Sequence, residues 1–270
     1  MVRTPPNSSA ARMSDDAFTV IATSVLAAIC ANVIHEGLGH AATALLTGAQ
    51  SGVLTTVAWT SDFDSRLVAA AGTLANLAAA IFFWIALRSL KRLTIHLRLF
   101  LLLSFAFNVL DGTGYFLFSG VANFGDWATV IAGLAPGWMW RTVLAVGGAA
   151  AYYAASLVVG IGLVRYVGIR RDDQSRLRRL TLIAYVTSIL LACAGALLNP
   201  FGIQLLWQSA LPATLGGHSA LMWLQYAIPR NAKPARADDR ILRSYSWIAI
   251  AAVIALAYLL VLGRGVTLRR

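Results

Sequence analysis

Two histidines and a glutamate lie together in an otherwise apolar stretch, Phe18 to Leu46, in the order His-Glu-Gly-Leu-Gly-His at residues 35–40. Glu36 is the single glutamate of the chain. A carboxylate between two imidazoles is costly to bury inside a membrane span, so a functional site is the default interpretation. Histidine nitrogens bind metal ions, and a nearby carboxylate can take a proton from water. The pattern therefore favours a metal site with hydrolytic chemistry.

The spacing of the two histidines is one residue longer than a regular helix allows. Histidines four residues apart share one face of an α-helix, whereas His35 and His40 would diverge by roughly 140°. A single-turn π-bulge absorbs one extra residue and returns both rings to one face. Gly37 and Gly39 ease that distortion, and small residues also allow close packing between membrane helices. We therefore predict a locally widened helix between His35 and His40.

A third metal ligand has to come from another part of the chain. Apart from Glu36, Asp111 is the acidic residue that lies well inside an apolar stretch, about two thirds of the way along residues 97–118. The first and third spans run in the same direction if the second one returns. Asp111 then lies at the same depth in the membrane as His35 and His40 and is available as a ligand.

The composition predicts a membrane protein, because 59% of the 270 residues are hydrophobic and 12% are charged. This length allows six or seven spans of about 20 residues each. The candidate spans are residues 18–46, 67–87, 97–118, 142–164, 180–198, 201–228 and 247–262. Pro212 and the Gly216-Gly217 pair interrupt the sixth candidate, so a broken or re-entrant helix is the alternative there. We expect an all-α polytopic membrane protein with six or seven transmembrane helices, a disordered leader over residues 1–16 and additional helices over residues 121–270.

The net charge of +11 does not indicate a nucleic-acid partner. The basic residues gather in the connections after the second, fourth and sixth candidate spans, and these connections alternate with arginine-poor ones. Such an asymmetry orients a protein in a bilayer and faces anionic lipid. We expect a multi-pass protein, with a bacterial plasma membrane as the location and the lipid bilayer as its surroundings.

Three motifs resemble those of the site-2 proteases, a family of intramembrane zinc metalloproteases. That family has a His-Glu-x-x-His helix followed by Ala, then an Ala-Gly-Pro-x-x-Asn-like segment, then an Asp-Gly that supplies the third zinc ligand. This chain has His-Glu-Gly-Leu-Gly-His-Ala at residues 35–41, Ala-Gly-Thr-Leu-Ala-Asn at 71–76 and Leu-Asp-Gly at 110–112. The motifs follow in the same order on successive spans, so residues 17–120 form the part similar to the protease core. The longer histidine spacing and Thr73 in place of proline depart from the family pattern.

The resemblance implies the role of each residue. His35, His40 and Asp111 would hold zinc, Glu36 would be the general base, and Asn76 would lie near the scissile peptide bond of a membrane protein or peptide substrate. Residues 48–59 look like the short extended segment that the family pairs with an unfolded substrate strand, which implies a short β-hairpin after the first span.

Two other functions are compatible with the same residues. One is a catalytically inactive binding or regulatory protein of the same fold, and the other is a proton or metal transporter. The later spans offer few polar residues for a transport path beyond Thr187, Ser188 and Gln208. His218 is a possible fourth ligand or substrate contact, although a histidine bonded to a neighbouring helix backbone is the interpretation we favour.

Overall fold

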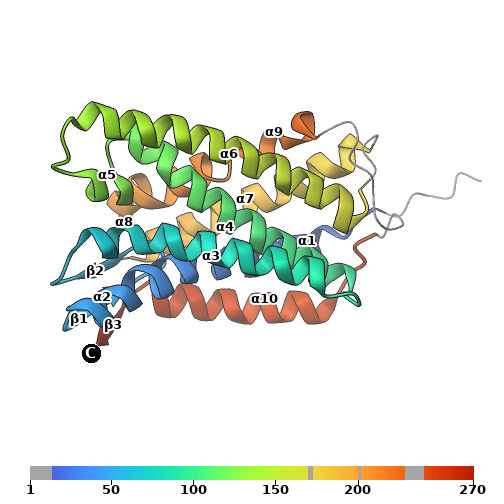
Figure 1. Cartoon of the computed structure of the whole chain (residues 1–270). Helices are drawn as coiled ribbons and strands as arrows, with labels where there is room; N and C mark the ends of the chain where they lie inside the picture. Colours follow the sequence, from blue (N-terminus) through green and yellow to red (C-terminus); the bar gives the residue numbers. More distant parts are fainter. Residues whose placement is uncertain (1–13, 170–172, 200–201, 229–239) are drawn as a thin grey trace, which may run out of the picture.

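Long helices packed side by side make up most of the computed structural model (Figure 1), which describes residues 14–169, 173–199, 202–228 and 240–270. Within these ranges, six helices are long and apolar enough to cross a membrane. They are Ala17–Thr47, α3 (Arg66–Ser89), α4 (Ile95–Ala122), α6 (Gly137–Val167), α7 (Gln174–Leu198) and Tyr245–Leu262. The first consists of α1 (Ala17–Asn32), η1 (Val33–Ala41) and α2 (Ala42–Thr47), and the last of α10 (Tyr245–Ala257) and η4 (Tyr258–Leu262). The chain is an all-α polytopic membrane protein, as the sequence predicted.

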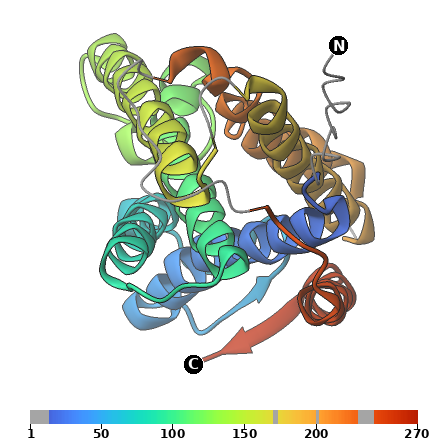
Figure 2. The ribbon, with the colours of Figure 1, turned by 90° about the vertical axis from the view of Figure 1, so that its right-hand side faces the viewer.

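Helix α4 lies at the centre of the bundle, in contact with α1, α3 and α6 (Figure 2). Its apolar side chains point in all directions, which is typical of a helix buried on every side. Leu102, Phe107 and Leu110 are completely buried. A side-chain carbon at Gly120 would lie 2.5 Å from the backbone nitrogen of Ala145, so α6 approaches α4 closely through small residues. Side chains on α4 therefore reach the interior of the molecule.

The sixth candidate span is broken, as the alternative for residues 201–228 predicted. Its described part consists of α8 (Gly202–Leu205), the π-helical turns η2 (Leu206–Ala210) and η3 (Pro212–Gly216), and α9 (Ala220–Ala227). Pro212 at the start of η3 has no backbone N–H and cannot continue a regular helical ladder. None of these pieces is long enough to cross a membrane alone, and His218 lies between η3 and α9.

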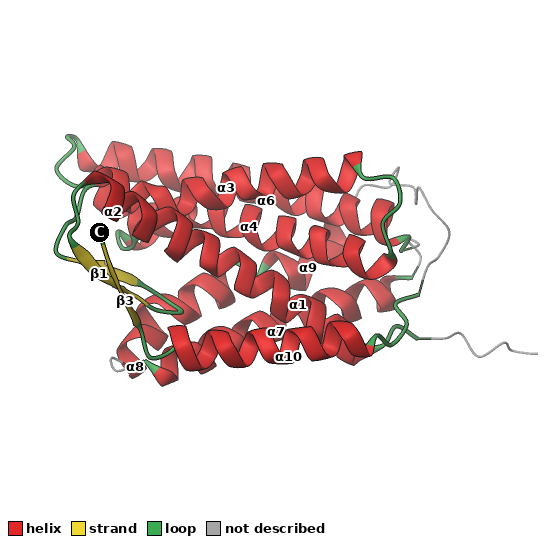
Figure 3. Ribbon diagram, turned by 90° about the horizontal axis from the view of Figure 1, so that it is seen from below, coloured by secondary structure: helices red, strands yellow, loops and turns green. Residues whose placement is uncertain are grey.

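A small antiparallel sheet lies at one end of the bundle (Figure 3). The predicted hairpin consists of β1 (Ser51–Leu54) and β2 (Trp59–Ser61), in which Val53 is opposite Thr60. The third strand, β3 (Val266–Arg269), pairs with the other edge of β1 and was not predicted. The order β2-β1-β3 leaves β2 with an unpaired edge. The short helix α5 (Asp126–Ile131) lies at the same end of the bundle (Figure 1).

Most of the leader expected over residues 1–16 lies outside the described residues, but its last part belongs to the folded protein. Asp15 is 4% exposed, and Arg176 donates hydrogen bonds of 2.7 and 2.9 Å to its two carboxylate oxygens. The backbone N–H of Ile241 donates a third hydrogen bond to Asp15 at 2.8 Å. Asp16 caps α1 by accepting a hydrogen bond from the Thr19 N–H. The chain entering α1 is thus tied to α7 and to the segment before α10.

We expect Asp15→Ala to destabilise the fold strongly. The substitution removes both carboxylate oxygens that accept from the buried Arg176 guanidinium, and breaking one side of a buried ion pair costs about 3–5 kcal/mol. Chemical unfolding in detergent micelles measures the change. Asp62→Ala is the matched control, because Asp62 is exposed. A loss no greater in Asp15→Ala than in the control would contradict the assignment.

Candidate metal centre

The helix is widened where the two histidines lie. Residues Val33–Ala41 form the π-helix η1, which confirms the predicted distortion between His35 and His40. The extra residue is absorbed, so both rings point to the same side of the helix. Their Nε2 atoms are 3.2 Å apart, and the ring planes are nearly perpendicular at 79°.

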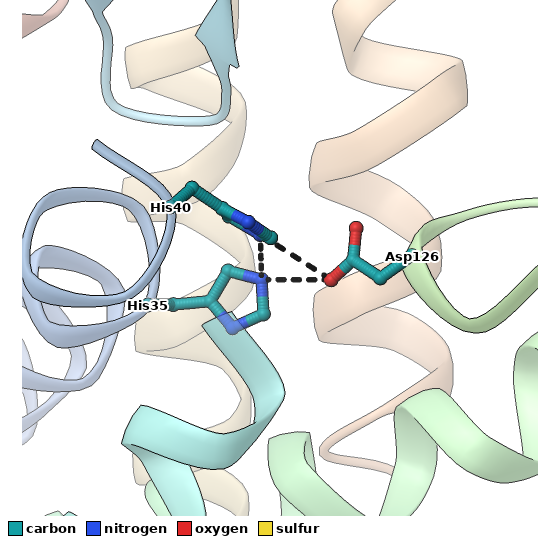
Figure 4. A group of neighbouring side chains, drawn as sticks. All are labelled: His35, His40 and Asp126. Carbon is teal, nitrogen blue, oxygen red and sulfur yellow. Dashed lines mark hydrogen bonds and ion pairs between the residues drawn. The ribbon is translucent and has the colours of Figure 1, made fainter. Parts of the chain in front are cut away.

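Asp126 completes a triangle of potential ligands with the two histidines (Figure 4). Its Oδ2 atom lies 3.3 Å from the Nε2 of His35 and 3.4 Å from the Nε2 of His40. Atoms that bind a tetrahedral zinc ion at about 2.0–2.1 Å are separated from one another by about 3.3–3.4 Å. Two imidazoles and a carboxylate at these separations can hold one metal ion and leave a fourth position open.

Hydrogen bonds at the other ring nitrogens leave both Nε2 atoms available to a metal. His40 Nδ1 donates to the Val68 carbonyl oxygen at 2.7 Å. His35 Nδ1 bonds to Asn76 Oδ1. The Asn76 amide nitrogen donates to Asn108 Oδ1 at 2.9 Å, so Asn76 Oδ1 is the acceptor from His35. These contacts fix ring orientation and tautomer in the way that outer partners of metal-bound histidines do.

The triangle has the donor chemistry of a cation site. With both Nδ1 atoms protonated, two nitrogen lone pairs and a carboxylate oxygen face one another, and a cation between them removes their mutual repulsion. Asp126 supplies the negative charge.

Gly72 on α3 keeps the space beside the two nitrogens open. A side-chain carbon at Gly72 would collide with the Nε2 of His40 and would lie 2.7 Å from the Nε2 of His35. Gly39 in turn has room only for a hydrogen, because a carbon there would lie 2.5 Å from the Gly72 Cα atom. Two glycines thus allow η1 and α3 to approach closely at the metal centre.

We expect Gly72→Ala to impair metal binding although it changes no ligand. The added methyl group has to displace the two ring nitrogens, and disturbing the outer shell of a metal site typically costs about 10–100-fold in affinity. Competition with a metal-sensitive dye measures this affinity in the purified protein. Gly147→Ala on α6 is the control, because nothing lies within 4 Å of a carbon built there. Equal affinity in both variants would contradict the geometry.

Asp111, the third ligand implied by the resemblance, is not part of this triangle. Its Oδ1 lies 3.0 Å from the Nε2 of His218. Four residues further along α4, the Tyr115 ring stacks on His35 with ring centroids 4.8 Å apart. The aromatic ring therefore occupies the position on α4 beside His35, so equal depth in the membrane did not bring Asp111 to the histidines.

Asp126 was not predicted as a candidate ligand, because it lies in a connection between two apolar stretches. Gly125 before it has a φ of 86°, a conformation that favours glycine, and the chain turns there into α5. The available signal was the Gly-Asp pair in an arginine-poor connection.

Glu36 and Asn76 have different surroundings. Glu36 is 6% exposed and lines a cavity of about 940 Å³ together with His35, His40 and Asp126. Asp111 lines the same cavity. Asn76, expected near the substrate, is completely buried behind His35 and is not among the residues that line this cavity. Within the described residues, Glu36 therefore forms part of the cavity wall, whereas Asn76 orients the ring of a potential metal ligand.

Comparisons with models of protein families, with curated proteins and with solved structures found no match. The resemblance therefore rests on the three motifs, and the function has to be argued from the metal centre and its cavity.

Proposed function

We propose that this protein is an intramembrane zinc metalloprotease that hydrolyses a peptide bond in a membrane-embedded or membrane-adjacent substrate. The observation that carries the proposal is the His35–His40–Asp126 triangle, with Glu36 lining the same cavity. Two nitrogen ligands and one oxygen ligand with an open fourth position are typical of catalytic zinc. When bound, zinc supplies the Lewis acidity that activates water and polarises a peptide carbonyl group.

The protein's own residues hold the rings and receive the proton in this proposal. Asn76 and the Val68 carbonyl oxygen keep the histidine rings oriented. Glu36 takes the proton that leaves water as the water oxygen attacks the peptide carbonyl carbon. Its carboxylate suits this role, since it is buried beside His35 but is not one of the three potential metal ligands.

The sheet provides a way to hold an extended substrate. All three residues of β2, Trp59, Thr60 and Ser61, line the cavity, and β2 is an edge strand of the sheet. An unpaired edge offers backbone hydrogen bonds to an added peptide strand. A peptide in this extended form exposes its carbonyl carbon, whereas a helical peptide sequesters it. We infer an unfolded segment of a membrane protein or a small apolar peptide as the substrate.

Zinc content and cleavage together test the proposal. The purified chain in lipid nanodiscs is analysed for metals and incubated with internally quenched apolar peptides, before and after zinc is removed by a chelator and returned. We expect about one zinc ion per chain, and cleavage that stops on removal and resumes on return. Cleavage that persists without metal, or a chain that holds no metal, would refute the proposal. Bound metal without cleavage of any peptide would instead support the inactive binding protein.

A further inference from the structure

A second cluster of ionisable side chains lies beside the metal centre. Asp111 on α4 faces His218, which lies between η3 and α9, and His218 in turn contacts Ser188 on α7. His218 is 4% exposed, and its ring packs on Phe107 with centroids 4.6 Å apart. Three separate parts of the chain therefore position one buried imidazole against one carboxylate.

The hydrogen bonds of this cluster require a proton between His218 and Asp111. The Ser188 hydroxyl donates to the Tyr185 carbonyl oxygen at 2.8 Å, so it accepts from His218 Nδ1, which is 2.9 Å away. The His218 Nε2 then faces Asp111 Oδ1 at 3.0 Å and has no other hydrogen-bond partner among the described residues. Two bare lone pairs at this separation would repel each other, whereas one shared proton makes the contact favourable.

Asp111 connects the cluster to the catalytic cavity. It lines the cavity of about 940 Å³ that Glu36 and the metal centre also line. Asp111, His218 and Glu36 together line a second cavity of about 60 Å³, which is large enough for water. Asp111 is thus the member of the pair that can touch substrate, and His218 is buried behind it.

We propose that Asp111 and His218 form a second proton-transfer pair of this site, in which Asp111 is catalytic and His218 is a positioning residue that supplies the proton. The inference rests on the proposed protease function. Water oxygen bonds to the carbonyl carbon, and the water proton passes to Glu36. The C–N bond breaks with its electron pair on nitrogen, and the nitrogen takes the shared proton through Asp111. The proton on Glu36 then returns to the pair, so the cycle balances.

Nitrogen NMR of the histidines tests the pair without a substrate. The chain has four histidines, so ¹⁵N-histidine labelling in lipid gives few signals, and His218→Gln assigns those of His218. We expect Asp111→Asn to shift the Nε2 signal of His218 and Ser188→Ala to shift its Nδ1 signal. Asp64→Asn is the control, because Asp64 lines the large cavity but not the small one. An unchanged His218 spectrum in Asp111→Asn would overturn the proposal.

Metal content and cleavage of the quenched apolar peptides test the catalytic role. We expect Asp111→Asn to keep its zinc and to cleave about 10²–10⁴-fold more slowly, as is typical when a positioned acid or base is lost. His218→Gln should also keep zinc and should slow cleavage by less, because Asp111 remains. Loss of zinc in Asp111→Asn would make Asp111 a metal ligand and overturn the pair, as would wild-type cleavage.

The two proposals fail in different ways. If the unmodified chain holds no zinc or cleaves no peptide, the protease function fails and the catalytic role of the pair fails with it, while the NMR shift still reports a structural pair. If the unmodified chain binds zinc and cleaves the peptides, and Asp111→Asn cleaves them at the same rate, the protease function stands and the proton-transfer pair alone is refuted.

Discussion

Asp126→Asn is expected to lose most of the zinc that we propose this protein binds. The asparagine has almost the same shape, but it replaces a negatively charged ligand by a neutral amide, in a triangle whose other two members are neutral imidazoles. Loss of an outer-shell partner alone costs about 10–100-fold in metal affinity, so loss of a direct ligand should cost at least about 100-fold. Elemental analysis after dialysis against a weak chelator measures the remaining metal.

Asp111→Asn provides the matched comparison, because Asp111 lines the same cavity but lies against His218. We expect this variant to keep the metal. The reverse result, with metal lost from Asp111→Asn and kept in Asp126→Asn, would restore the ligand set that the resemblance implies. His40→Ala should resemble Asp126→Asn, since it removes one corner of the triangle.

The widened helix could be predicted from the sequence because each residue of an α-helix rotates by about 100° around the helix axis. Histidines five residues apart cannot share a metal on a regular helix, and the resulting prediction of a widened helix was confirmed by η1 (Val33–Ala41). The spans were predictable for a similar reason, since apolar length is set by the thickness of the bilayer. The break near Pro212 was predictable because proline cannot donate a ladder hydrogen bond.

The third potential ligand, Asp126, was not predictable from the depth of residues in the membrane. Depth does not determine which side of α4 a residue lies on, and it does not determine the path of the connection after α4. Asp111 and Tyr115 are separated by about one helical turn and share a face of α4, and Tyr115 is the one that stacks on His35. Asp126 reaches the histidines only because the chain turns at Gly125 into α5. Pairing of β3 with β1 depends in the same way on long-range contacts that carry no local signal.

The role of Asn76 was also not predictable from its spacing in the sequence. The Ala-Gly-Thr-Leu-Ala-Asn segment was expected to contribute a substrate contact through Asn76. In the structure, Gly72 leaves space beside the two Nε2 atoms and Asn76 accepts from His35, so both residues support the two rings of the candidate metal centre. Spacing alone does not distinguish a residue that faces the cavity from one that supports a ligand behind it.

Glu36→Gln is expected to abolish peptide cleavage while the metal and the fold remain. The amide has almost the same shape and can still form a hydrogen bond with water, but it cannot accept the proton that leaves as water attacks the carbonyl carbon. Removing a positioned general base should slow cleavage of the quenched apolar peptides by about 10²–10⁴-fold. Because Glu36 is outside the His35–His40–Asp126 triangle, the zinc content should equal that of the unmodified chain.

The thermal stability of Glu36→Gln distinguishes a general base from a residue that supports the fold. Glu36 is 6% exposed and has no ion-pair partner among the described residues, and burying an unpaired carboxylate is costly. Exchanging it for a neutral amide should therefore leave the melting temperature of the metal-free protein unchanged or raise it, as is common when a functional residue is removed. A lower melting temperature would indicate that Glu36 supports the fold, zinc loss would make it a ligand, and an unchanged cleavage rate would exclude it as the base.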